Sequence, residues 1–135
     1  MSYPVTEISG IDDDAAKALK SAGIRTTVGL LEAAKDAKGR KALAAKTGFS
    51  ESRLLEWANV ADRMRIKGVG GEYADLLFRA GVKTVRDLKH RNGTKLAQAI
   101  KAANDRRKRV LFLPSEKAVT KWIEQAKKLP LKIKY

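Results

Sequence analysis

The sequence contains no cysteine and only one histidine, and these absences exclude several kinds of site. Without cysteine there can be no disulfide, no thiolate zinc site and no cysteine nucleophile. No apolar run is long enough to cross a bilayer, and residues 1–4 lack the basic and apolar regions of a signal peptide. We therefore expect a soluble, cytoplasmic protein that has no membrane partner.

Catalytic motifs are also missing from the chain. It has no P-loop, no G-x-S-x-G, no HExxH and no convincing pair of carboxylates, and His90 lies in the polar stretch KHRNG, where a solvated imidazole is expected. The acidic run Asp12–Asp14 could bind a cation, but helix starts commonly gather acidic residues. An enzyme is the least favoured class, and we expect no catalytic residue, no metal site and no cofactor.

Acidic residues are scarce in one half of the chain. The 135 residues carry 29 Lys and Arg against 15 Asp and Glu, a net charge of +14. Residues 1–65 hold 11 basic and 9 acidic residues, whereas residues 66–135 hold 18 and 6, a net charge of +12. Such clustering favours a polyanionic partner for the second half, although a solubilising surface is the alternative.

Two segments repeat along the chain. ISGIDDDAAKALKSAGIRTTVGLL, from Ile8, matches the stretch that begins at Ile66, at an offset of 58 residues. SESRLLEWANVA, from Ser50, matches SEKAVTKWIEQA, from Ser115, at an offset of 65 residues. The sequence thus indicates two copies of one module sharing a core, residues 1–65 and 66–135, with a net insertion of seven residues in the second copy.

Both copies have helical patterns. Asp12–Asp14 can cap a helix that ends before Gly23, and Thr26 and Thr84 are expected N-caps of the next helix in each copy. The closing helices carry apolar stripes at the same spacing, and this spacing predicts that Trp57 and Trp122 are core residues. The C-terminal LKIKY is expected to be an extended tail.

The order of glycines and apolar residues in the second copy resembles the helix-hairpin-helix family. The residues that carry this resemblance are Ile66, Gly68, Val69, Gly70, Ala74, Leu77, Gly81, Val82 and Thr84. It implies an all-α fold of duplicated helix-hairpin-helix (SAM-like) modules packed as one domain. Paired units of this family occur in DNA repair and recombination proteins, and a related module forms the C-terminal domain of the bacterial RNA polymerase α subunit. The tandem arrangement also resembles a bacterial family of uncharacterised function.

Glycines at a helix start have two open interpretations. In the first, Gly68, Gly70 and Gly71 serve only to let two helices turn and pack. Alternatively, their main-chain N–H groups and the positive end of the helix dipole hold a phosphate, with Lys67 beside them. The first copy has Asp12–Asp14 at the corresponding place, so that hairpin is expected to be structural.

A basic run in the second copy has no counterpart in the first. Arg106, Arg107, Lys108 and Arg109 follow a predicted helix, and such a run is either a solvated edge or a phosphate-binding surface. The candidate nucleic-acid-binding residues are therefore Lys67, Gly68, Gly70, Gly71, Lys83, Lys101, Arg106, Arg107, Lys108 and Arg109.

These features favour sequence-tolerant nucleic-acid binding through backbone phosphates. DNA is favoured over RNA, and association with a bacterial nucleoid would agree with this role. No row of Arg, Asn or Gln typical of a base-reading helix is evident. The alternative is an adaptor whose helical surface binds an acidic protein.

Overall fold

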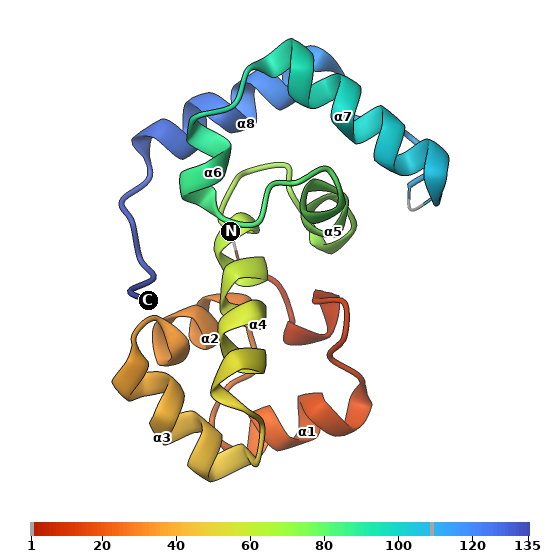
Figure 1. Ribbon diagram of the computed structural model, residues 1–135. Helices are drawn as coiled ribbons and strands as arrows, with labels where there is room; N and C mark the ends of the chain where they lie inside the picture. The colour runs from red at the N-terminus through yellow and green to blue at the C-terminus, as the bar shows by residue number, and fades with distance from the viewer. Residues whose placement is uncertain (1, 109) are drawn as a thin grey trace.

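The computed structural model describes residues 2–108 and 110–135, and short loops join its helices (Figure 1). A 3-10 helix, η1 (Val5–Glu7), comes first. The α-helices are α1 (Asp13–Ser21), α2 (Thr27–Ala34), α3 (Ala37–Thr47), α4 (Glu51–Arg63), α5 (Gly71–Arg79), α6 (Val85–Lys89), α7 (Gly93–Arg106) and α8 (Glu116–Lys128). The described residues contain one isolated β-bridge, between Pro4 and Thr26, and no strand. The expected all-α fold class is confirmed.

The helix boundaries follow the capping residues of the sequence. Asp12 accepts a hydrogen bond from the N–H of Ala15 at 2.8 Å, and Gly23 has a φ of +86° directly after the α1 C-cap. Thr26 and Thr84 cap α2 and α6 with their hydroxyl oxygens. These predictions are confirmed. The caps could be predicted from local sequence because an N-cap side chain bonds to an N–H only two or three residues further on.

Helix α4 lies at the centre of the molecule and contacts helices from both halves of the chain (Figure 1). It packs on α2 and α3 along its length and on α5 and α6 at its C-terminal end, while α8 packs on α6 and α7. One apolar core extends from Val5 to Ala126 and includes Trp57 and Trp122, each 4% exposed. The prediction that both tryptophans are core residues is confirmed.

The C-terminal tail, residues 129–135, returns from α8 to the first half of the chain (Figure 1). It is extended, as expected. The N–H of Lys134 donates to the carbonyl of Lys35 at 2.7 Å, and the buried Arg40 donates to the carbonyl of Lys134 at 2.8 Å. The Tyr135 hydroxyl donates to Asn59 at 2.7 Å. The tail therefore fixes the first half of the chain to the second.

Arg63, the last residue of α4, makes a second connection between the halves. Its side chain is 2% exposed; Nε donates to the carbonyl of Ala74 in α5 at 3.2 Å, and Nη1 donates to the carbonyl of Lys83. Its guanidinium also lies over the Phe78 ring, 5.7 Å from the centroid. Burial lowers the pKa of Arg63 to about 10, so the side chain is still charged at neutral pH.

Replacing Arg63 with methionine should lower the free energy of unfolding by about 3 kcal/mol, because two carbonyls in the protein interior lose their charged donor. Arg53→Met is the matched control, since Arg53 is exposed and lies over the rings of Phe49 and Trp57 without burying its charge. The control should lose less than about 1 kcal/mol. Urea denaturation measures both; equal stability of the two variants would contradict this role of Arg63.

Candidate nucleic-acid interface

The three glycines before and at the start of α5 differ in whether the fold requires them. Gly68 has a φ of +95°, a conformation that residues with a Cβ rarely adopt. A Cβ on Gly71 would collide with the main-chain carbonyl oxygen of Glu7. Gly70 has a φ of −87°, and a Cβ there would meet nothing within 4 Å. The fold thus requires Gly68 and Gly71, but it does not require Gly70.

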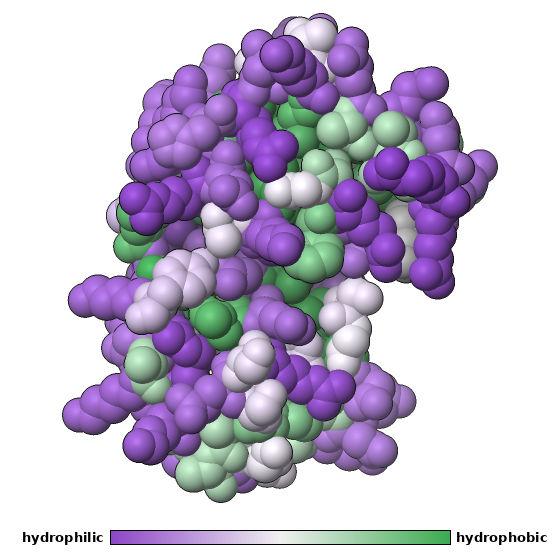
Figure 2. Space-filling model, viewed as in Figure 1, coloured by the Kyte–Doolittle hydropathy of each residue, from purple (hydrophilic) through white to green (hydrophobic). Residues whose placement is uncertain are grey.

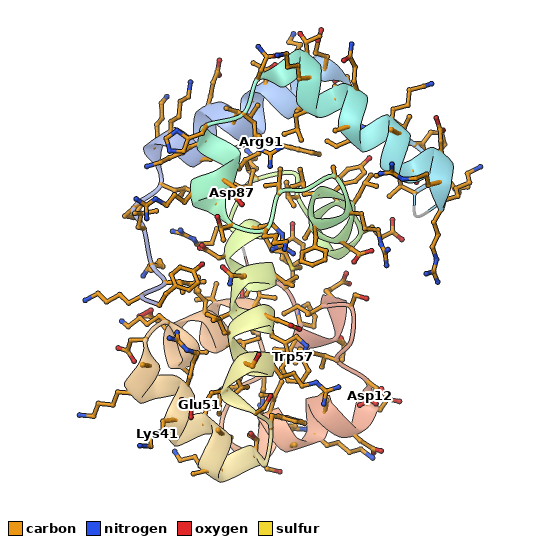
Figure 3. All side chains as sticks on the ribbon, in the orientation of Figure 1. Asp12, Lys41, Glu51, Trp57, Asp87 and Arg91 are labelled. Atoms are coloured by element: carbon orange, nitrogen blue, oxygen red, sulfur yellow. The ribbon has the colours of Figure 1, made fainter. Side chains whose placement is uncertain are left out.

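Gly70 is the N-cap of α5 and leaves this helix without a side-chain cap. In the described part of the chain, each of the other α-helices has a cap whose side chain accepts a hydrogen bond from a first-turn N–H. The contrast with α1 is direct: Asp12, labelled in Figure 3, occupies the position that matches Gly70 in the repeat. The α5 start, residues 70–73, therefore presents first-turn amides that no N-cap side chain occupies.

A shallow hollow of about 320 Å³ lies at the α5 start. Gly68, Gly70 and Gly71 line it together, as the sequence predicts for a phosphate site, but Glu7 and Glu72 line it as well. Glu7 lies 64 positions before Gly71 in the chain, so no local sequence pattern indicates that it belongs to this hollow. An anion that reaches these amides passes two carboxylates, and their repulsion reduces the attraction of the helix dipole.

Lys67 precedes the hollow, and its main chain is held in place. Its N–H donates to Gln125 Oε1 at 2.9 Å, and Gln125 Nε2 donates to the Lys67 carbonyl at 3.2 Å. Lys67 itself is exposed. Helix α8 thus fixes the backbone that presents this cation next to Gly68.

The basic segment, which we define as Arg106, Arg107 and Lys108, lies at the end of α7. All three residues are exposed, and Arg109 falls outside the described residues. Lys101, one turn earlier, is also exposed and forms a solvated ion pair with Asp105 at 3.7 Å. Such a pair contributes little to stability, so it does not prevent Lys101 from contacting an anion.

Tyr73 joins the basic segment's loop to the α5 start. It is the third residue of α5, and its hydroxyl donates to the carbonyl of Phe112 at 2.8 Å. Its ring packs on Trp122, with 5.4 Å between the centroids. The loop that follows the basic segment therefore lies within one turn of the uncapped amides. From sequence the role of Tyr73 was open; in the structure it supports this loop.

Lys83 lies on a different surface from the hollow. It borders a cleft of about 450 Å³ between α4, α5 and the loop at Gly10, and its Nζ lies 5.8 Å from the centroid of the Phe78 ring. Arg53 and Arg63 also line this cleft, but so do Glu56 and Asp75. Gly71 borders both the cleft and the hollow. Lys83 therefore shares the cleft with Gly71, but it does not line the hollow at the α5 start.

Most of the face shown in Figure 2 is hydrophilic, in keeping with the high content of charged residues. Within residues 2–108 and 110–135, no group of three His, Asp or Glu side chains is arranged to hold a metal ion. None of the helices that the structure describes is both long and apolar enough to cross a membrane.

Comparison with known proteins identifies a family but no function. No curated protein and no solved structure matches the chain. The model of one family, described as a domain of unknown function (DUF4332), matches residues 9–129, which include all eight α-helices of the described part of the chain. The chain belongs to this DUF4332 family of domains of unknown function.

Proposed function

We propose that this protein binds nucleic acid, and DNA in preference to RNA, through backbone phosphates at the α5 start and the basic segment. The observation that carries the proposal is the missing cap of α5, the one α-helix of the described chain whose first-turn amides have no N-cap side chain. Lys67, an exposed cation, directly precedes Gly68, and the exposed basic segment leads into the loop whose Phe112 carbonyl accepts from Tyr73 of α5. A phosphate is an anion of suitable size and charge for a helix start of this kind.

The proposal includes a duplicated helix-hairpin-helix-like architecture. In support, Gly10 and Gly68, which match in the repeat, both have positive φ, and a Cβ on either would lie against the indole Nε1 of the matching tryptophan. These distances are 3.6 Å to Trp57 and 3.2 Å to Trp122. The α3 counterpart, α7, has 14 residues against 11, and residues 107–115 replace the short connection 48–50. The basic segment lies where the second copy is longer.

The first experiment titrates labelled duplex DNA, single-stranded DNA and RNA with the protein at several salt concentrations. Phosphate binding predicts that log K falls by about 0.9 per phosphate neutralised on duplex DNA. An adaptor for an acidic protein would bind all three nucleic acids weakly and with little difference among them. That outcome would contradict the proposal.

Gly70→Asn and Gly70→Asp should each make the protein more stable and its DNA binding weaker. The φ and ψ of Gly70, −87° and −169°, are close to the −81° and −178° of Asp12, so either side chain can cap α5. Thermal unfolding should show a gain of roughly a few tenths of a kcal/mol, because glycine is only that much poorer as an N-cap than Asn or Asp. Anisotropy should show weaker binding for both variants, and the larger loss for Asp, which adds charge.

The two substitutions separate amide access from charge. The asparagine side chain would accept a hydrogen bond from a first-turn N–H without adding a negative charge. Weaker DNA binding by Gly70→Asn would therefore show that the free amides themselves contact the phosphate. If both variants gain stability and bind duplex DNA as tightly as wild type, the α5 start is not a phosphate site.

Reversing the charges of Arg106 and Arg107 to glutamate should weaken duplex binding by at least about tenfold, and should lower the salt slope by roughly 0.9 for each lost phosphate contact. Lys38→Glu with Lys41→Glu is the matched control, because it makes the same charge change at exposed positions of α3 (Lys41 is labelled in Figure 3). An equal loss in both double variants would show that only net charge matters, and would contradict a located site.

Glu72→Gln should tighten duplex binding about two- to threefold, because it removes a carboxylate from the rim of the hollow. Glu51→Gln is the control, since Glu51 is a first-turn acid of α4 and its loss costs a similar helix-dipole interaction. Unchanged or weaker binding of Glu72→Gln relative to this control would place the phosphates elsewhere.

A further inference from the structure

Three consecutive large apolar residues lie exposed shortly after the basic segment in the sequence. Leu111 and Phe112 are each 81% exposed and Leu113 is 40% exposed; we call these three residues the apolar tip. Other large exposed apolar residues are spread singly over the described chain, at Val28, Phe78, Leu131 and Tyr135. Consecutive exposure of this kind costs hydrophobic free energy in the free protein, and it is typical of a surface that becomes covered on binding.

The main chain at the apolar tip is held by two residues, Asn104 and Tyr73. Val110, 5% exposed, exchanges two hydrogen bonds with Asn104: its N–H donates to Oδ1 at 3.1 Å, and Nδ2 donates to its carbonyl at 3.3 Å. Tyr73 donates to the Phe112 carbonyl. Because these bonds fix the main chain, the side chains of the tip are presented outward at little further entropic cost on binding.

We propose that Leu111 and Phe112 form a wedge that inserts between stacked base pairs of a duplex held by the basic segment; this inference rests on the proposed function. Proteins that bend DNA commonly insert apolar side chains at a base step while cations hold the flanking phosphates. Here three described cations lie three to five residues before Leu111, and Tyr73, which anchors the tip, belongs to the first turn of α5. In the proposed complex, the basic segment and the α5 start would supply the phosphate contacts that hold the duplex at the wedge.

Charge complementarity favours duplex DNA over an anionic membrane as the partner. The tip borders a small hollow together with Glu72, and Glu7 lines the neighbouring hollow at the α5 start. A flat anionic membrane would bring many headgroups against both carboxylates at once, whereas a narrow duplex backbone would bring only the phosphate at the α5 start past them. Two or three apolar side chains also bury too little area for stable membrane anchoring.

The test uses the double variant Leu111→Ser with Phe112→Ser in the full chain. Binding is followed by anisotropy with a labelled duplex, unstacking by the fluorescence of 2-aminopurine placed in that duplex, and bending by energy transfer between the duplex ends. Wild type should raise 2-aminopurine fluorescence and bring the ends together by a kink in the range of about 20–90°. The variant should lose both signals and bind about tenfold more weakly, with an unchanged salt slope.

The control is Val28→Ser, which removes an exposed apolar side chain from α2, far from the basic segment in sequence. It should behave as wild type in all three measurements. The Arg106→Glu, Arg107→Glu variant should instead lose binding and reduce the salt slope, so the two kinds of contact are distinguished.

Three outcomes would overturn the wedge. If wild type binds duplex with steep salt dependence but neither unstacks nor bends it, the wedge is wrong while phosphate binding stands. If wild type binds no nucleic acid, the proposed function fails and the wedge with it. If the double variant loses binding to vesicles of phosphatidylserine and phosphatidylcholine while its DNA signals are unchanged, the tip's partner is a membrane.

Discussion

Short helices need acceptors for their first-turn N–H groups, and this constraint organises the whole structure. With helices of 5 to 14 residues, a large share of main-chain donors belongs to first turns. Side chains of Asp, Asn, Ser or Thr satisfy them at the start of every described α-helix except α5. Helix α5 departs from this rule, and the proposed phosphate site rests on that departure.

The contacts that connect the two halves of the chain fix the positions of the groups around the α5 start. Arg63 ties α4 to α5 and to the segment before α6, and the C-terminal tail ties α8 to α3. Gln125 of α8 holds the main chain of Lys67, and Tyr73 holds the loop after the basic segment. The amides, the cations and the apolar tip are therefore positioned by one connected framework, so a ligand would meet them already arranged.

Features that depend on near neighbours in sequence could be predicted, and features that depend on distant contacts could not. The caps at Asp12, Thr26 and Thr84 follow from residues three positions apart, and the helical spacing of the Trp57 stripe fixed its buried face. In contrast, Gly71 is required by Glu7, which comes near it only in the folded chain. The apolar run of Leu111, Phe112 and Leu113 was visible next to the basic run, but its exposure depends on Asn104 and Tyr73.

The most direct test of the central claim is an amide ¹H–¹⁵N NMR titration with a short DNA duplex. If the α5 start binds phosphate, the amides of residues 70–73 and 106–108 should shift together, at the same duplex concentration, and the shifts should weaken with added salt. The amides of residues 12–15 at the capped α1 start should stay unchanged. Shifts confined to other helices, or equal shifts at both helix starts, would contradict the account.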